Sequence, residues 1–118
     1  MIKITVESEG QVVDTFIFDK HEISIGRDND NHIIIDSLTV SSHHARILKI
    51  DNKYWLEDLG STNGTYLDDQ QISTAQLIDN HTISVGNHDL LVHIGAAKKS
   101  TFTPIKTVTI DKKKPPEK

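Results

Sequence analysis

Residues 45–57 read Ala-Arg-Ile-Leu-Lys-Ile-Asp-Asn-Lys-Tyr-Trp-Leu-Glu, and this stretch decides the expected fold class. Apolar positions recur at about every second residue on both sides of Asp51-Asn52. A period of two places successive side chains on opposite faces of an extended chain, and an Asp-Asn pair favours a turn. The stretch therefore predicts two β-strands separated by a turn.

Runs of the same kind recur through the first 95 residues. The other predicted strands are residues 2–6, 13–18, 23–25, 32–35, 65–67, 82–85 and 90–94. No segment carries a sustained apolar stripe with the 3.6-residue helical period. An all-β sandwich or barrel is therefore the economical interpretation.

The character of the chain changes after Gly95. Residues 96–118 are mostly small, polar and basic, and they contain all three prolines. We expect residues 1–95 to form one domain and residues 96–118 to be a flexible basic tail or linker. The 118-residue chain has no cysteine, so neither disulfides nor thiolate zinc sites can stabilise it. Its stability must come from packed strands.

The charges are distributed unevenly about a net value of −4. Residues 1–95 carry 15 Asp and Glu against 6 Lys and Arg, whereas residues 96–118 carry 2 against 7. An acidic body disfavours nucleic acid, because affinity for that polyanion requires neutralised phosphates. No apolar stretch has the length of a signal peptide or of a membrane span. We therefore expect a cytoplasmic protein that binds neither nucleic acid nor membranes.

Three polar clusters lie between predicted strands: Gly26-Arg27, Ser41-Ser42-His43-His44 and residues 60–65. Together they offer a guanidinium, several hydroxyls and a carboxamide, which suit a phosphate because an arginine fork makes charge-assisted hydrogen bonds and neutral donors complete the remaining oxygens. Taken singly, each cluster also has a structural interpretation. Arg27 can be a surface cation, the two serines ordinary loop polarity, and Asn63-Gly64 a hairpin turn.

Taken in order, the clusters resemble the signature of the forkhead-associated (FHA) domain. The matching motifs are Gly26-Arg27, Ser41-x-x-His44 followed by Ala45, and Asp58-Leu59-Gly60-Ser61-Thr62-Asn63-Gly64-Thr65. They cover about residues 23–67, and the strand pattern extends the resemblance over residues 1–95. The resemblance implies an eleven-stranded β-sandwich whose loops at one end bind an extended phosphorylated peptide.

The resemblance also implies roles for individual residues. Arg27 and Ser41 would bind the phosphate, Thr62 would contact the ligand nearby, and Asn63 would hold the peptide backbone. Ser42 stands where the family often has arginine, lysine or asparagine, so it would assist phosphate binding with a shorter, uncharged donor and the expected affinity is moderate. The residues expected to support the site architecturally are Gly26, His44 and Gly64.

Neither a metal site nor a catalytic site is expected. His43 and His44 are adjacent where the chain enters a predicted strand, so their side chains should point to opposite faces. The other five histidines lack the paired spacing of zinc ligands. A triad of Ser41, His44 and Asp58 can be drawn, but no Gly-x-Ser-x-Gly elbow surrounds the serine. We therefore expect no enzymatic activity, no cofactor and no metal.

These inferences predict a phosphothreonine-dependent interaction module whose partner is a protein or peptide phosphorylated in a Ser/Thr kinase pathway. The alternative is a phosphate-independent assembly module with the same fold. The tail adds a further hypothesis about partners. Thr107 has an aliphatic residue, Ile110, three positions beyond it, and phosphorylation there would let the tail dock onto its own domain or onto a second molecule.

Overall fold

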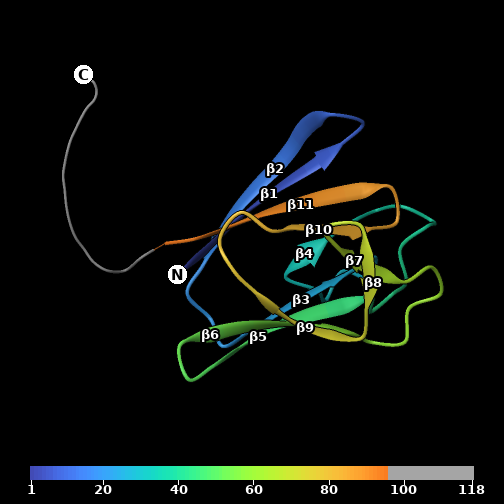
Figure 1. The fold of residues 1–118 in the computed structure, drawn as a ribbon. Helices are drawn as coiled ribbons and strands as arrows, with labels where there is room; N and C mark the ends of the chain where they lie inside the picture. Colours follow the sequence, from blue (N-terminus) through green and yellow to red (C-terminus); the bar gives the residue numbers. More distant parts are fainter. Residues whose placement is uncertain (96–118) are drawn as a thin grey trace, which may run out of the picture.

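The computed structural model describes residues 1–95, which form eleven strands in two sheets (Figure 1). The first six strands are β1 (Ile2–Ser8), β2 (Gln11–Phe18), β3 (Glu22–Gly26), β4 (Ile33–Ile34), β5 (Ala45–Ile50) and β6 (Lys53–Asp58). The remaining five are β7 (Thr65–Leu67), β8 (Gln70–Ile72), β9 (Thr74–Leu77), β10 (Thr82–Val85) and β11 (His88–Ile94). This described part contains no helix, and therefore none that could cross a membrane.

The strands are divided between a six-stranded and a five-stranded sheet. The order in the first is β2-β1-β11-β10-β7-β8, and in the second β4-β3-β5-β6-β9. Neighbouring strands are antiparallel except for the short parallel pair β3 and β4. Figure 1 shows the two sheets as stacked layers, as in a β-sandwich. The expected eleven-stranded all-β sandwich is confirmed.

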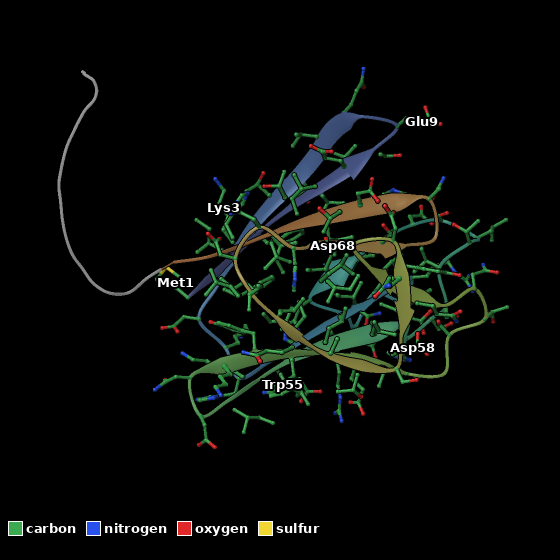
Figure 2. The ribbon with its side chains drawn as sticks, viewed as in Figure 1. Met1, Lys3, Glu9, Trp55, Asp58 and Asp68 are labelled. Atoms are coloured by element: carbon green, nitrogen blue, oxygen red, sulfur yellow. The ribbon has the colours of Figure 1, made fainter. Side chains whose placement is uncertain are left out.

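The core lies between the two sheets and follows the alternation of the sequence. In β1, Ile2, Ile4 and Val6 are buried, whereas Lys3 between them is exposed. In β6, Tyr54 and Leu56 are buried, and Figure 2 shows Trp55 on the outer face of the five-stranded sheet. The largest fully buried core side chains are Ile2, Ile4, Ile23, Ile25, Ile33, Ile47, Leu56, Leu77, Ile83 and Leu90. Burial of so many branched apolar side chains, at about 1.5–3 kcal/mol each, stabilises the domain without disulfides.

The structure contains two strands that the sequence pattern did not predict, β8 and β9. Residues 70–77 read Gln-Gln-Ile-Ser-Thr-Ala-Gln-Leu, which is too polar to give an alternating apolar signal. Both strands lie at sheet edges, and each pairs with a single neighbour. An edge strand buries fewer side chains, so its backbone hydrogen bonds hold it in place without a strong hydrophobic pattern.

The turn at Asn63-Gly64 is not a hairpin. The tight β5–β6 turn has positive φ angles of 53° at Asp51 and 65° at Asn52, as expected of a type I′ turn. At the other site only Gly64 has a positive φ, and the strands that flank it, β6 and β7, belong to different sheets. The hairpin interpretation of Asn63-Gly64 is therefore wrong, and this segment carries the chain from one sheet to the other.

Candidate functional site

The three polar clusters lie at one end of the sandwich because of the strand register. Ile25 pairs with Ala45, and Ala45 pairs with Asp58. The chain therefore leaves β3 at Gly26, enters β5 at Ala45 and leaves β6 at Asp58 at the same edge. In Figure 2, Asp58 marks this end of β6, where the loop to β7 begins. Loops placed side by side on rigid strands are the usual position for binding residues.

Arg27 follows β3, and two hydrogen bonds hold it against the segment that precedes β5. Its backbone N–H donates to the carbonyl of Ser41 at 3.0 Å, and its side-chain Nε donates to the carbonyl of Val40 at 3.0 Å. Within residues 1–95, no hydrogen bond or ion pair engages the terminal Nη groups. The guanidinium is thus oriented through one nitrogen, while the fork remains available to an anion.

Ser41 connects the β4–β5 loop to the β6–β7 loop. Its hydroxyl oxygen accepts a hydrogen bond from the backbone N–H of Thr62 at 3.1 Å. Since the oxygen is used as an acceptor, the hydroxyl proton is free to be donated to a ligand. Asn63 makes a second connection, from its Nδ2 to the carbonyl of Thr39 at 2.9 Å. These two contacts hold donors from both loops next to Arg27.

A small hollow of about 110 Å³ lies between these side chains. The residues that line it are Arg27, Leu38, Thr39, Val40, Ser41, Thr62 and Asn63. Four of the five predicted binding residues are therefore brought together. Ser42 does not line the hollow, and its backbone carbonyl accepts from Asp28 N–H at 3.2 Å and from Asn31 Nδ2 at 2.8 Å.

His44 is completely buried beneath the hollow. Its Nδ1 accepts the backbone N–H of Ser41 at 3.0 Å, so the ring proton is assigned to Nε2, which donates to the carbonyl of Gly64 at 2.9 Å. Both ring nitrogens are occupied, and neither contacts a serine hydroxyl or the Asp58 carboxylate. The Ser41–His44–Asp58 triad therefore does not form in this structure, and the imidazole instead connects the two binding loops.

Asp58 organises the β6–β7 loop from its first residue. Its carboxylate accepts from Ser61 Oγ at 2.5 Å, from Thr65 Oγ1 at 2.6 Å and from the backbone N–H of Gly60 at 3.0 Å. Burial, the largest single influence, raises the pKa of this carboxyl, but the hydrogen bonds together outweigh it and leave the pKa below the ordinary value of 3.8. The charged form of Asp58 thus holds the loop that carries Thr62 and Asn63.

Gly26 is required by close packing and not by backbone conformation. Its φ is not positive, but a Cβ at this position would collide with the Ser42 carbonyl oxygen and lie 2.8 Å from Asn31 Nδ2. Asn31, which the sequence analysis did not single out, is buried and donates to the carbonyls of both Asp28 and Ser42. Nothing in the sequence distinguishes it from the neighbouring loop asparagines. Asn31 thus connects the loop that follows Arg27 to Ser42, shortly before β5 begins.

One group of potential metal ligands lies beside the hollow. Asp28, Asp30 and His43 each place one ligand atom within 4.8 Å of the others, and all three are exposed. His43 already pairs with Asp30 at 3.0 Å. The spacing of the histidines in the sequence does not indicate this group, because the two carboxylates approach His43 only through the folded loops. As expected, His43 and His44 point in opposite directions, one to solvent and one into the core.

The fold and the hollow define a class of protein: a β-sandwich whose loops present an arginine fork and several neutral donors at one end. The chain belongs to the FHA domain family, whose model matches residues 23–86, more than half of its length. The family resemblance of the sequence is thereby confirmed. FHA domains are protein-interaction modules.

Individual relatives agree with this assignment. The glycogen accumulation regulator GarA of Mycobacterium tuberculosis is 32% identical over 80 residues, which cover 68% of this chain and 49% of the relative. The chain thus spans about half the length of these relatives. The FhaA FHA domain complexed with the intracellular domain of Rv3910 superimposes with a TM-score of 0.71 at 26% identity, covering 79% of this chain and all of that domain. Mycobacterium tuberculosis EmbR in complex with a low affinity phosphopeptide gives 0.73 at 29% identity, covering 83% of this chain and 25% of EmbR.

Proposed function

We propose that residues 1–95 bind a phosphothreonine on a partner protein at the hollow between the β4–β5 and β6–β7 loops. The observation that carries this proposal is the arrangement of Arg27, whose Nε donates to the Val40 carbonyl and whose side chain lines the same hollow as Ser41, Thr62 and Asn63. A phosphate brings about −1.5 to −2 charges and three acceptor oxygens, so it needs such a fork together with neutral donors.

The roles proposed for the residues are those that the family resemblance implies, and the geometry of the hollow is compatible with them. Arg27 binds the phosphate through its Nη groups, and Ser41 donates its free hydroxyl proton to the same group. Thr62 supplies a second hydroxyl, and Asn63, fixed by Thr39, binds the peptide backbone. Ser42 stays an assisting residue at the edge of the site, since its carbonyl is already used within the loops. Gly26, His44 and Gly64 keep the loops in position.

The site supports binding without catalysis. Its one buried imidazole is occupied at both nitrogens, and no base lies next to Ser41 Oγ in the described residues. We therefore propose an adaptor for the product of a Ser/Thr kinase in the cytoplasm, which acts through recognition alone. We also propose that the phosphopeptide-binding domain ends at residue 95.

The decisive experiment compares a phosphothreonine peptide library with its unphosphorylated copy by calorimetry. We expect binding of the phosphorylated peptides alone, and we expect Arg27→Ala to remove most of it because a charge-assisted contact to a dianion is lost. The chain offers a matched control in its other arginine, Arg46, which pairs with Glu57 and Glu22 away from the hollow. Arg46→Ala should bind normally. Equal binding of both libraries would favour the phosphate-independent assembly module instead.

A further inference from the structure

Within residues 1–95, β2 is an unpaired sheet edge. This eight-residue strand pairs with β1 alone, with a bulge at Val13, so the backbone groups on its other side have no strand partner. Figure 1 shows it at the outer border of the six-stranded sheet. Val12, Val13 and Ile17 on this strand are 59%, 56% and 64% exposed. A long, apolar edge is a template for another strand, and proteins usually cover such an edge.

A second hollow, of about 310 Å³ and separate from the candidate binding site, lies directly beside this edge. Val13 and Phe16 of β2 line one side, and Ile34 and Ile35 at the edge of the other sheet line the opposite side. The sandwich is therefore open between its two edge strands, β2 and β4. A strand added next to β2 would close this opening.

The sequence beyond the described residues contains a segment with the pattern of such a strand. Residues 101–110 read Thr-Phe-Thr-Pro-Ile-Lys-Thr-Val-Thr-Ile. The odd positions carry four threonines and Ile105, and the even positions carry Phe102, Pro104, Val108 and Ile110 together with Lys106. This alternation is typical of a strand with one buried face, and β-branched residues favour it. Pro104 is compatible with an edge strand, where one side of the backbone needs no donor.

We propose that residues 101–110 pair antiparallel with β2 and turn the face that carries Phe102 toward the hollow between the two sheets. This strand would be the seventh of the larger sheet and would cover its open edge.

The position where β11 ends makes this pairing reachable. Ile94 pairs with Ile2, and Ile2 pairs on its other side with Phe18. The chain therefore leaves the sheet two strands away from the carboxyl end of β2. A strand outside β2 lies about 14 Å from β11, since neighbouring strands are about 4.8 Å apart. Residues 96–100 can span about 17 Å when extended, which is sufficient.

Charge and register support the same arrangement. Residues 96–118 carry seven lysines against two acidic residues, whereas residues 1–20 carry four acidic residues against two lysines. In an antiparallel pair that places Phe102 opposite Phe18, Lys106 lies opposite Asp14, because Lys106 is four residues after Phe102 and Asp14 is four residues before Phe18. Opposite charges and aromatic pairs in such cross-strand positions are stabilising.

The first test uses the absence of cysteine from the natural chain. In the full-length chain, the I17C/T103C pair joins positions that face each other in this register, and I17C/T109C is a matched control six residues out of register. We expect the first pair to form an intramolecular disulfide about tenfold faster, because a free tether would close both loops at nearly the same rate. Equal rates would overturn the proposal. Disulfide-linked dimers of the I17C/T103C variant, formed instead of the intramolecular bond, would also overturn it and assign the edge to a second copy.

The second test measures hydrogen exchange of the β2 amides in the full chain. Phe102→Lys puts a charge on the face that turns toward the hollow, whereas Thr103→Lys puts the same charge on the outer face. If residues 101–110 cover the β2 edge about nine tenths of the time, the first variant should accelerate exchange of alternate β2 amides about tenfold. The second variant should leave this exchange unchanged. The same exchange in both variants and in the unmodified chain would refute the docking of this segment.

Discussion

His44 donates a hydrogen bond from Nε2 to the carbonyl oxygen of Gly64 at 2.9 Å, and this contact joins the two binding loops from below. The same ring accepts the backbone N–H of Ser41 through Nδ1 at 3.0 Å. One buried side chain thus sets the distance between Ser41, the proposed donor to the ligand, and the loop that carries Thr62 and Asn63. Both the stability of the domain and its affinity for phosphopeptides should therefore depend on His44.

We expect His44→Ala to lower the free energy of unfolding by about 2–4 kcal/mol, since it leaves a cavity and two unpaired backbone groups. Phosphopeptide affinity should fall as well, because the loops lose their connection. The neighbouring His43 is a matched control, with a side chain that is 52% exposed. His43→Ala should change stability by less than about 0.5 kcal/mol in denaturant unfolding. Equal effects of the two substitutions would contradict this account of His44.

Gly26→Ala should destabilise the domain by about 1–3 kcal/mol, because the new methyl group collides with the backbone carbonyl of Ser42, which cannot rotate away. The displaced segment also carries Arg27, so phosphopeptide binding should weaken. Gly95→Ala is the control, since a Cβ there meets no atom within 4 Å. Thermal unfolding of both variants would show the difference, and a Gly26→Ala domain as stable as the control would argue against the close packing.

The Asp58 carboxylate should make stability depend on pH in the acid range. Its pKa in the folded state lies below the ordinary 3.8, so the folded state favours the charged form. This contribution is complete at pH values above the unfolded pKa and is lost as the pH falls through the folded pKa. The difference in unfolding free energy between the natural chain and Asp58→Asn should therefore shrink from about pH 6 to about pH 2. Chemical denaturation of both proteins measures it, and a difference that is constant over this range would exclude the proposed charge effect.

Phosphothreonine peptides should bind better than phosphoserine peptides, and glutamate in place of the phosphorylated residue should not bind. The family resemblance implies a small apolar contact for the threonine methyl group, and a carboxylate has neither the charge nor the third oxygen of a phosphate. Competition of the three peptides against a fluorescent phosphothreonine probe would rank them. Comparable displacement by the glutamate peptide would mean that the site around Arg27 does not recognise a phosphate.

Phosphorylation of Thr107, which lies outside the described residues, should reduce affinity for an external phosphopeptide. A tethered ligand acts at an effective concentration near millimolar, so it would compete with a free partner of micromolar affinity. Phosphothreonine can be installed at position 107 by peptide ligation, with phosphothreonine at 109 as the matched control, and affinity and molecular mass can then be measured. Unchanged affinity together with an unchanged mass would reject self-docking.

The sequence by itself determined the fold class and the identity of the loops. The buried faces of β1, β3, β5 and β6 show as alternating apolar residues, because a half-buried strand needs that period wherever it lies in the sheet. The Gly26-Arg27, Ser41-x-x-His44 and Asp58–Thr65 motifs carry a recognisable order. These features depend on local spacing, which a linear sequence records.

Only the tertiary structure decided which groups meet. The strands β8 and β9 are held by backbone pairing at sheet edges, where a side-chain pattern is not required. The contacts from Arg27 to Val40 and from His44 to Gly64 join residues 13 and 20 positions apart. Asn31 can hold its loop in place by hydrogen bonds because Gly26, which has no Cβ, leaves room for its side chain. A hydrogen bond depends on distance and angle in three dimensions, so the sequence could predict the donors of this site but not the partners that hold them.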